Sequence, residues 1–364
     1  MKTFLPLLIL FISLGCSSCH EINHVITSGQ QPGGHGTDQT TSNEPFETPV
    51  GLAQYESSSH PLRSSGKTFA DIPYGSDPKN GYDLILPNTS SSSSLSPLVI
   101  FFHGGGFIQG NKNSLYKKPI VMKEMEGYLD AGIAVANVNY RLLENNETEG
   151  LMKCLRDAQH ALQSIKAGSP ENGIDPDRIV LRGTSAGASL SLWLALSDDM
   201  SQADSSNPIL RESTKVAGAV VESTQSTLDI TKWEDVLSAF NFRYNEGLDA
   251  EMKSRIYGLY GMPVQSGNIV RSTFEGGSQA YRSKVDFASF IDQNDPPIFV
   301  ANKPNLSGPP SDKNTLFHHR EHAHYLQEQA EKTGGPFLAK SKFYYLTDPT
   351  MKETTDFVKE LVKN

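Results

Sequence analysis

A serine flanked by glycines stands near the middle of the chain, in Gly183-Thr184-Ser185-Ala186-Gly187. The segment fits the pattern G-x-S-x-G, in which the serine lies on a tight turn between a strand and a helix, where larger side chains two positions away would collide. The apolar run "DRIVLRG" precedes the turn and "SAGASLSLWLAL" follows it, so the required strand and helix are both expected. We therefore predict that Ser185 is a nucleophile.

A second glycine cluster, "HGGGF" at His103–Phe107, follows the apolar run "PLVIFF". Consecutive glycines let backbone N–H groups come close to a substrate carbonyl, and the N–H of Ala186 at a helix start can act as the partner donor. The alternative is a glycine-rich turn without a ligand. The order of the two motifs favours an oxyanion hole.

Strand-like and helical segments alternate through most of the chain and predict the elements that position these motifs. Two short runs, "KTFADIPYG" and "GYDLILP", come first and suggest an antiparallel start. Continuous apolar runs then alternate with helical patterns, which predicts a mostly parallel sheet with helices on both faces. Residues 228–290 interrupt this rhythm and are interpreted as a small helical cap inserted over the sheet.

The segments "PLVIFFHGGGF", "CLRDAQHALQSI" and "NGIDPDRIVLRGTSAGASL" together resemble α/β-hydrolases of the hormone-sensitive-lipase type, near bifunctional feruloyl and acetyl-xylan esterases. This resemblance implies an α/β-hydrolase fold and a carboxylesterase without a cofactor. It implies Ser185 as nucleophile and Gly104, Gly105 and Ala186 as the oxyanion hole. It also implies that His103 is structural and that Arg141 and Asp157 form an ion pair bracing the sheet.

The remaining catalytic residues depart from the pattern of this family. A serine needs a histidine to remove its proton and a carboxylate to orient that histidine. Asp312 is the candidate acid, since Asp292 and Asp295 precede the strand "PPIFVAN" rather than follow it. After the last strand, "KFYYLT", the family has its histidine, but this chain continues with "DPTMKETTDFVKELVKN", which contains none.

Four histidines lie earlier, in "HHREHAH": His318, His319, His322 and His324. One interpretation makes His318 or His319 the base, paired with Asp312. A second makes the segment a surface helix with solvated histidines. A third pairs His318 with His322 across one helical turn on a metal, but no third ligand is evident, so no metal is predicted.

Two functions follow from these readings. The first is a serine carboxylesterase that cleaves small acyl or aryl esters, with acetyl or feruloyl groups on polysaccharide as the substrates implied by the resemblance. The second is a catalytically impaired pseudo-hydrolase that binds a glycan or a partner in the same cleft. The two glycine motifs favour the esterase, and the missing histidine loop favours the binding module.

The first 19 residues have the features of a lipoprotein-type signal peptide: one lysine, an apolar run and small residues before Cys16. Cys16, or alternatively Cys19, is the candidate lipidation site, and ordinary secretion is the competing interpretation. Residues 20–65 are rich in Ser, Thr, Gly and Pro and predict a flexible tether to a domain at 66–364. We expect export and attachment to a bacterial membrane, facing the periplasm or the exterior.

Charge and cysteine content exclude other classes of protein. The net charge of −9 over 364 residues argues against a nucleic-acid partner, because phosphate would be repelled. Cys154 lies on an apolar helix face and is expected to be a buried thiol, so no disulfide framework is predicted.

Overall fold

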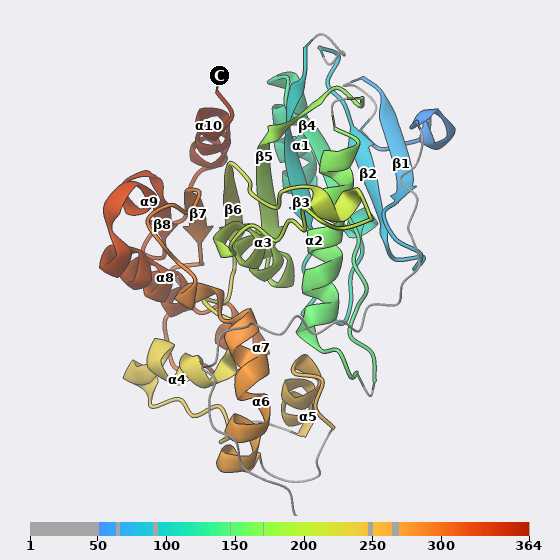
Figure 1. Ribbon diagram of the computed structural model, residues 1–364. Helices are drawn as coiled ribbons and strands as arrows, with labels where there is room; N and C mark the ends of the chain where they lie inside the picture. The colour runs from blue at the N-terminus through green and yellow to red at the C-terminus, as the bar shows by residue number, and fades with distance from the viewer. Residues whose placement is uncertain are drawn as a thin grey trace, which may run out of the picture. The chain divides into compact units, whose positions relative to one another are not determined.

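The computed structural model describes residues 51–62, 66–89, 94–145, 147–169, 171–246, 250–263 and 269–363. These residues form an eight-stranded sheet in the order β1-β2-β4-β3-β5-β6-β7-β8 (Figure 1). The strands are β1 (Thr68–Pro73), β2 (Gly81–Ile85), β3 (Ser96–Phe102), β4 (Ala134–Val138), β5 (Ile174–Thr184), β6 (Gly218–Glu222), β7 (Ile298–Ala301) and β8 (Lys342–Tyr344). β2 pairs antiparallel with β1 and β4, and the remaining pairs are parallel. The mostly parallel sheet with an antiparallel start is therefore confirmed.

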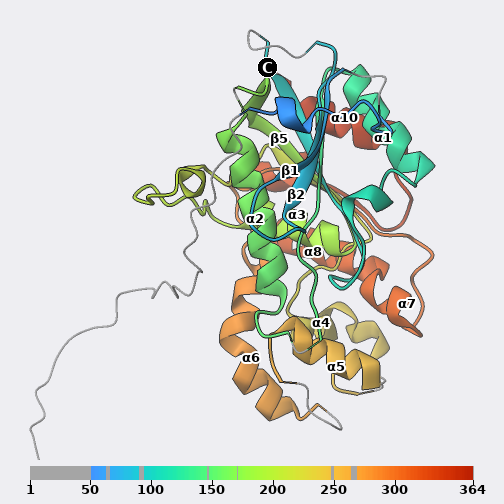
Figure 2. The same cartoon turned by 90° about the vertical axis from the view of Figure 1, so that its right-hand side faces the viewer.

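Helices cover both faces of this sheet, as predicted. Figure 2 views the sheet along its edge, with α1 and α10 on one side and α2 on the other. The α-helices are α1 (Pro119–Asp130), α2 (Leu151–Ala167), α3 (Ala186–Leu196), α4 (Trp233–Val236), α5 (Ala250–Leu259), α6 (Arg271–Val285), α7 (Lys313–Phe317), α8 (Arg320–Thr333), α9 (Gly335–Lys340) and α10 (Met351–Leu361). Short 3-10 helices lie at Ala53–Tyr55, Lys112–Ser114, Ile209–Arg211, Ile230–Lys232, Ser238–Phe240 and Phe287–Ser289.

The central strands contain continuous apolar runs because they face a core on each side. Along β3, Leu98 and Ile100 pack into the core under α2 and α3, whereas Val99 and Phe101 pack into the core under α1 and α10. Successive side chains of a strand point to opposite faces, so a continuous apolar run fits a strand covered on both sides. Helix α3 is buried along its whole length, which explains its nearly unbroken apolar sequence.

The ion pair expected beside the sheet is present. The Arg141 guanidinium lies 2.6 Å from the Asp157 carboxylate, which also accepts hydrogen bonds from the Arg141 backbone N–H and from Asn80. This carboxylate fixes the segment after β4 against α2. Cys154 on the same helix is buried, and its thiol donates to the Arg141 carbonyl at 3.1 Å.

The folded domain begins before residue 66, so the predicted tether is too long at its end. Leu62 is only 1% exposed and packs in the core with Ile85 and Phe101. His60 is buried beside Asp83, with 3.6 Å between ring nitrogen and carboxylate. Leu52 is also buried, and a backbone bridge between Glu56 and Phe69 joins this polar segment to the sheet. The predicted signal peptide, Cys16, Cys19 and the tether up to residue 50 lie outside the described residues.

The insertion at residues 228–290 contains α4, α5 and α6 and lies beyond one end of the sheet (Figures 1 and 2). Its aromatic side chains form its core: the Phe274 ring contacts the rings of Tyr244, Tyr257 and Tyr260. Arg282 pairs with Asp229 at 2.8 Å and ties α6 to the start of the insertion. The prediction of a helical cap is therefore confirmed for its described residues.

The connection between β7 and α8 differs from the sequence expectation, whereas the connection after β8 agrees with it. The segment before α8 was expected to be a loop, but it contains the separate five-residue helix α7. The connection from β8 to α10, residues 345–350, is short and carries no histidine.

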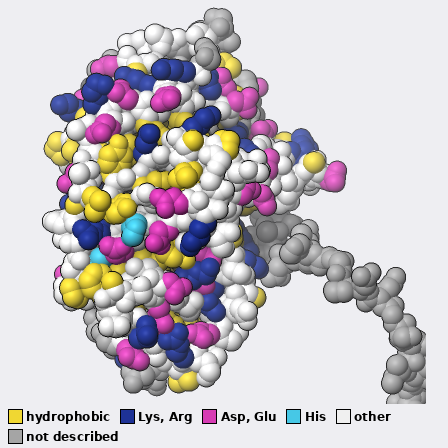
Figure 3. Space-filling model, turned by 90° about the vertical axis from the view of Figure 1, so that its left-hand side faces the viewer, with side chains coloured by type: hydrophobic (Ala, Val, Ile, Leu, Met, Phe, Trp, Pro, Cys, Tyr) yellow, Lys and Arg dark blue, Asp and Glu magenta, His cyan; other side chains and the backbone are white. Residues whose placement is uncertain are grey.

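Basic and acidic side chains are interspersed on the face shown in Figure 3 rather than gathered into a broad basic patch. Within the described ranges, no helix combines the length and the apolar character needed to cross a membrane.

Candidate active site

Ser185 lies on a strained turn between β5 and α3. Its φ of 56° and ψ of −122° are unusual for a residue with a side chain. A Cβ at Gly183 would lie 2.1 Å from the Gly187 carbonyl oxygen, and a Cβ at Gly187 would lie 2.1 Å from the carbonyl oxygen of Phe102. Both contacts are too short for any side chain. The turn thus requires glycine on each side and presents Ser185 at the end of the sheet.

The glycine loop after β3 runs directly against this turn. A Cβ at Gly104 would lie 2.7 Å from the Thr184 carbonyl oxygen, and a Cβ at Gly105 would lie 1.9 Å from that of Gln109. Gly105 also has a φ of 127°, in the region that favours glycine. Gly104, Gly105 and Ala186 line the same cleft as Ser185, as an oxyanion hole requires.

His103, at the start of that loop, packs on Tyr140 and hydrogen-bonds to the loop backbone. Its ring stacks on Tyr140 with centroids 4.4 Å apart, and Nδ1 lies 2.8 Å from the Gly104 carbonyl oxygen. Burial lowers the pKa of His103 to about 4, so the ring is neutral and Nδ1–H donates to that carbonyl. These contacts fit the structural role expected for this histidine.

His318 is the histidine that meets Ser185. Its Nε2 lies 2.9 Å from the Ser185 Oγ, the distance of a hydrogen bond between nucleophile and base. His318 directly follows α7, and its Nδ1 lies 2.9 Å from the side-chain oxygen of Asn314. Burial, reinforced by Lys303, lowers the pKa of His318 below its ordinary value. The neutral ring accepts from Ser185 and donates through Nδ1–H to Asn314.

Asp312 does not contact His318. Its carboxylate caps α7 by accepting the Thr315 backbone N–H at 2.7 Å, and it is exposed. Asn314 stands four residues before His318, one helical turn away, and its amide therefore occupies the place expected for the acid. The sequence expectation for Asp312 is corrected on this point: the carboxylate serves as a helix cap.

Two buried side chains fix the backbone immediately before His318. The Nε2–H of His322 donates to the Leu316 carbonyl at 3.0 Å, and the Gln225 amide donates to the Phe317 carbonyl at 2.9 Å. Gln225 comes from the segment after β6, so it ties the base to the sheet that carries the nucleophile. The short helix is thus held by hydrogen bonds from neighbouring elements.

His319 is turned away from Ser185 and has a structural role. Its ring is completely buried, accepts the Glu321 backbone N–H as the cap of α8, and donates to the Gly308 carbonyl at 2.9 Å. The Asn302 amide after β7 donates to the His319 carbonyl at 2.9 Å. Of the two adjacent histidines expected as base, the structure brings His318 to the serine.

The metal interpretation and the surface-helix interpretation both fail for His322. His318 precedes α8, so it does not share a helical face with His322, whose Nδ1 accepts the Ser226 backbone N–H at 3.2 Å. No group of three or more His, Cys, Asp or Glu within the described part of the chain is placed to hold a metal ion. The side chain of His324 is 41% exposed, and its Nδ1 lies 2.9 Å from the Glu321 carboxylate.

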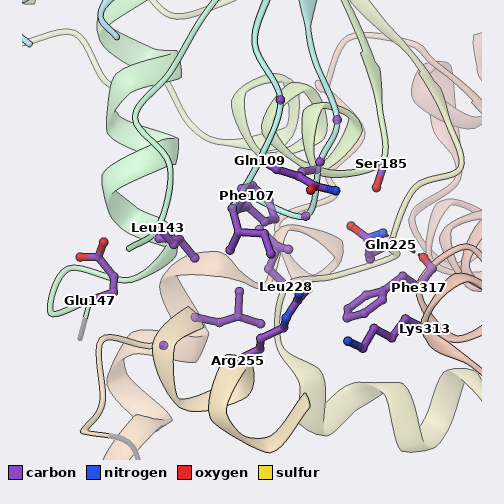
Figure 4. Close-up of a pocket in the computed structure, with 18 of the residues that line it drawn as sticks. Phe107, Gln109, Leu143, Glu147, Ser185, Gln225, Leu228, Arg255, Lys313 and Phe317 are labelled. Atoms are coloured by element: carbon purple, nitrogen blue, oxygen red, sulfur yellow. Dashed lines mark hydrogen bonds between the residues drawn. The ribbon is translucent and has the colours of Figure 1, made fainter. Parts of the chain in front are cut away.

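A cleft with a volume of about 1820 Å³ opens in front of Ser185, between the sheet, the cap and α7 (Figure 4). Its apolar walls include Phe107 near the glycine loop, Leu228 from the cap and Phe317 from α7. The volume exceeds what a small ligand usually fills, so an extended substrate has room in it.

Comparisons with known proteins agree with this fold. Residues 82–305 match the model of the BD-FAE family. The chain belongs to the BD-FAE family. This match covers the two glycine motifs and the cap, and it confirms the resemblance to α/β-hydrolases that the sequence motifs indicated.

Two curated relatives of this BD-FAE chain illustrate its similarity to other hydrolases. A probable isoprenylcysteine α-carbonyl methylesterase of Arabidopsis thaliana is 34% identical over 122 residues, which are 33% of this chain and 23% of the relative. Kynurenine formamidase of Danio rerio is 31% identical over 160 residues, 43% of this chain and 48% of the relative. The chain thus spans less than half the length of these relatives.

Solved structures extend the likeness over most of the BD-FAE chain. A truncated carbohydrate esterase from gut microbiota has a TM-score of 0.59 at 16% identity, covering 82% of this chain and 97% of that one. An acetyl ester-xyloside bifunctional hydrolase from Caldicellulosiruptor lactoaceticus has a TM-score of 0.50 at 19% identity, covering 80% and 92%. At these identities the likeness shows the α/β-hydrolase fold.

Proposed function

We propose that the protein is a serine carboxylic ester hydrolase that cleaves small acyl or aryl esters. The observation that carries this proposal is the 2.9 Å contact between Ser185 Oγ and His318 Nε2, beside a glycine loop and within a large cleft. The alternative of a non-catalytic binding module depended on a missing histidine. Because His318 contacts Ser185, the absence of a histidine after the last strand no longer supports that alternative.

The reaction begins with His318 taking the proton of the Ser185 hydroxyl as the oxygen attacks the ester carbonyl carbon. Negative charge then develops on the carbonyl oxygen, where the backbone N–H groups of Gly104, Gly105 and Ala186 stabilise it. His318 returns the proton to the departing alcohol, which leaves an acyl group on Ser185. A water molecule, deprotonated by the same ring, releases the acid and restores the serine.

Asn314 acts as a positioning residue in this scheme. Its side-chain oxygen accepts the Nδ1–H of His318, which fixes the ring orientation and leaves the lone pair of Nε2 facing Ser185. An amide is neutral, so it orients the ring but stabilises the positive charge that the ring gains during attack less than a carboxylate does. Catalysis then depends on orientation and on the oxyanion hole more than it does with a carboxylate.

The decisive test is the hydrolysis of p-nitrophenyl acetate by the full chain and by the variants Ser185→Ala and His318→Ala. Each variant is expected to lose about 10⁴-fold or more in kcat, since nucleophile and base act as one unit. His324→Ala is the matched control, because this histidine is more exposed and contacts Glu321 on α8, away from the serine. Wild-type turnover that persists unchanged in Ser185→Ala would sink the proposal.

For the substrate, we propose acetyl or feruloyl esters on a polysaccharide. The size of the cleft supports this proposal, as does the fold shared with structures named as a carbohydrate esterase and an acetyl ester-xyloside hydrolase. Release of acetate and ferulate from acetylated and feruloylated xylan measures it directly. Ser185-dependent hydrolysis of p-nitrophenyl acetate without release of either acid would restrict the activity to small esters.

We also propose that the chain is exported and held at a bacterial membrane by a lipid on Cys16, with Cys19 as the alternative site. The apolar segment and small residues before Cys16 support this. Cys16→Ala is expected to move the protein from the membrane fraction to the soluble fraction, whereas Cys19→Ala leaves it in place. The reverse result assigns Cys19, and no effect of either contradicts the anchor.

A further inference from the structure

The segment after the glycine loop folds back onto that loop and places Gln109 beside it. The backbone N–H of Gln109 donates to the Gly105 carbonyl at 3.1 Å. A Cβ at Gly105 would lie 3.2 Å from the Cγ of Gln109, so the side chain itself runs along this glycine. Gln109 therefore lies directly against a residue of the expected oxyanion hole.

The backbone on both sides of Gln109 is held in place. The N–H of Ile108 also donates to the Gly105 carbonyl, at 3.2 Å. Gly110 has a φ of 103°, and a Cβ there would lie 2.6 Å from the Gly104 carbonyl oxygen and 2.7 Å from the His103 Nδ1. Backbone packing alone thus fixes the position of Gln109, and its amide is not needed for that purpose.

The amide of Gln109 is available to a ligand. Gln109 is exposed and lines the cleft, and Figure 4 shows its side chain extending toward Ser185. Within the part of the chain that the structure describes, no group forms a hydrogen bond with this amide. Two other amides of the cleft are already engaged, because Gln225 donates to the backbone before His318 and Asn314 contacts the His318 ring.

The cleft has an enclosed apolar side and an exposed rim. On the enclosed side, Leu228 and Trp233 are buried, and the Phe317 ring meets the Trp233 ring edge to face with centroids 5.3 Å apart. Gln109 lies on the exposed rim together with Gly106. A large alcohol part of an ester must extend into solvent, so it leaves along the rim, while the acyl part packs on the apolar side.

Two further polar side chains of the connection from β3 to α1 line the cleft, and neither matches a hydroxyl group as well as Gln109 does. The Ser114 hydroxyl donates to the Asn111 carbonyl at 2.6 Å. Lys118 is exposed and offers donors only. An amide offers a donor and an acceptor, and a hydroxyl group needs one of each.

We propose that Gln109 determines specificity for esters whose alcohol part carries a hydroxyl group beside the ester oxygen, as a sugar does. The position of Gln109 against Gly105 restricts its reach to atoms near the ester, so the hydroxyl group is the one on the neighbouring carbon. This inference rests on the proposed esterase activity and names the residue that selects the alcohol. Gln109 binds this hydroxyl group and takes no part in the transfer of protons.

The experiment compares ester pairs that differ in one hydroxyl group, with the full chain as the enzyme. For the alcohol part, the pair is trans-2-hydroxycyclohexyl acetate and cyclohexyl acetate. For the acid part, it is methyl phloretate and methyl dihydrocinnamate. Titration of the released acid gives kcat/KM after subtraction of the rate with Ser185→Ala. The measured quantity is the ratio of kcat/KM for the hydroxylated ester to that for its parent.

The test variant is Gln109→Leu, and Asn145→Leu is the matched control. Asn145 is also an exposed amide that lines the cleft, but it belongs to the connection from β4 to α2, whose Leu143 and Glu147 lie away from Ser185 in Figure 4. We expect Gln109→Leu to lower the ratio for the alcohol pair about three- to tenfold, the range for one neutral hydrogen bond. The parent esters, the acid pair and the control are expected to keep their values.

The outcomes separate this inference from the proposed function. Ser185-dependent hydrolysis of cyclohexyl acetate with an alcohol-pair ratio that Gln109→Leu leaves unchanged overturns the role of Gln109 and keeps the esterase. The same holds if the ratio falls only because the variant hydrolyses cyclohexyl acetate faster, if the acid pair responds instead, or if Asn145→Leu lowers the ratio equally. Absence of Ser185-dependent turnover on every ester overturns both.

Discussion

The turn that carries Ser185 and the short helix that precedes His318 meet in one site, but they are held by different means. Around Ser185 the backbone alone makes the contacts, and Gly183 and Gly187 are required because any Cβ would strike a carbonyl oxygen. Around His318 the contacts come from buried side chains, with Gln225 and His322 donating to the two carbonyls just before it.

This difference indicates which changes each half of the site tolerates. The nucleophile depends on the absence of side chains, so its sequence pattern is short, local and easy to recognise. The base depends on an amide and an imidazole that reach it from other parts of the chain. Such an arrangement leaves no compact motif, and it can be built wherever a buried donor faces a helix end.

The substitution expected to disrupt the turn around Ser185 most strongly is Gly187→Ala. The added methyl group would lie 2.1 Å from the Phe102 carbonyl oxygen, so the turn and the loop after β3 must separate. We expect a loss of about 3 kcal/mol in unfolding free energy or a failure to fold. Gly276→Ala on α6, where a methyl group meets nothing within 4 Å, is expected to leave Tm unchanged or higher. Thermal unfolding measures both, and equal Tm values contradict the argument.

The corresponding substitution near His318 is Gln225→Leu, which removes the hydrogen bond to the Phe317 carbonyl. Displacement of His318 by a fraction of an ångström is expected to lower kcat about 10²-fold while the fold survives. Gln163→Leu is the control, because Gln163 is also buried and donates to the Glu212 carbonyl at 2.8 Å. Similar losses of kcat in both variants would show a general stability effect instead.

A smaller effect is expected when the neutral partner of His318 is given a charge. Asn314→Asp places a carboxylate beside Nδ1, which is expected to raise the pKa of His318 by about 1 unit or more and to increase kcat several-fold. The acid limb of kcat/KM then moves to higher pH, because a base with a higher pKa is protonated sooner as the pH falls. Asp312→Asn is the control: it alters the cap of α7 and leaves the limb in place. A limb that moves with Asp312 instead would restore Asp312 as the acid.

The smallest effect concerns Lys303, whose positive charge contributes to the lowered pKa of His318. Because burial and Lys303 hold this pKa below its ordinary value, activity is expected to persist at pH values where a free histidine is charged. Lys303→Gln raises the pKa by a few tenths of a unit and shifts the acid limb upward by that amount. This shift of the acid limb is expected at low salt. It is expected to vanish at high salt, because the charge of the exposed Lys303 is then screened. A shift that persists at high salt contradicts a charge effect.

The sequence predicted the sheet, the cap and the serine turn because apolar runs and glycine spacing report them locally. The sequence also limited the candidates for the catalytic base to His318 and His319. Only the break between α7 and α8 decides which of them faces the serine. Asn314 was missed, and Asp312 was taken for the acid. A five-residue helix is too short for an apolar period, although Asp312 with Thr315 three residues later forms a capping box that could have revealed α7.

In the proposed reaction His318 is the base, so the connection from β8 to α10, residues 345–350, has no catalytic role. In such a chain this connection is free to change in length and composition during evolution, whereas the segment around α7 is not. Alignments that search for the histidine after the last strand would classify this protein as inactive. Homologues that share an asparagine four residues before a histidine, ahead of the last strand, are the ones to group with it.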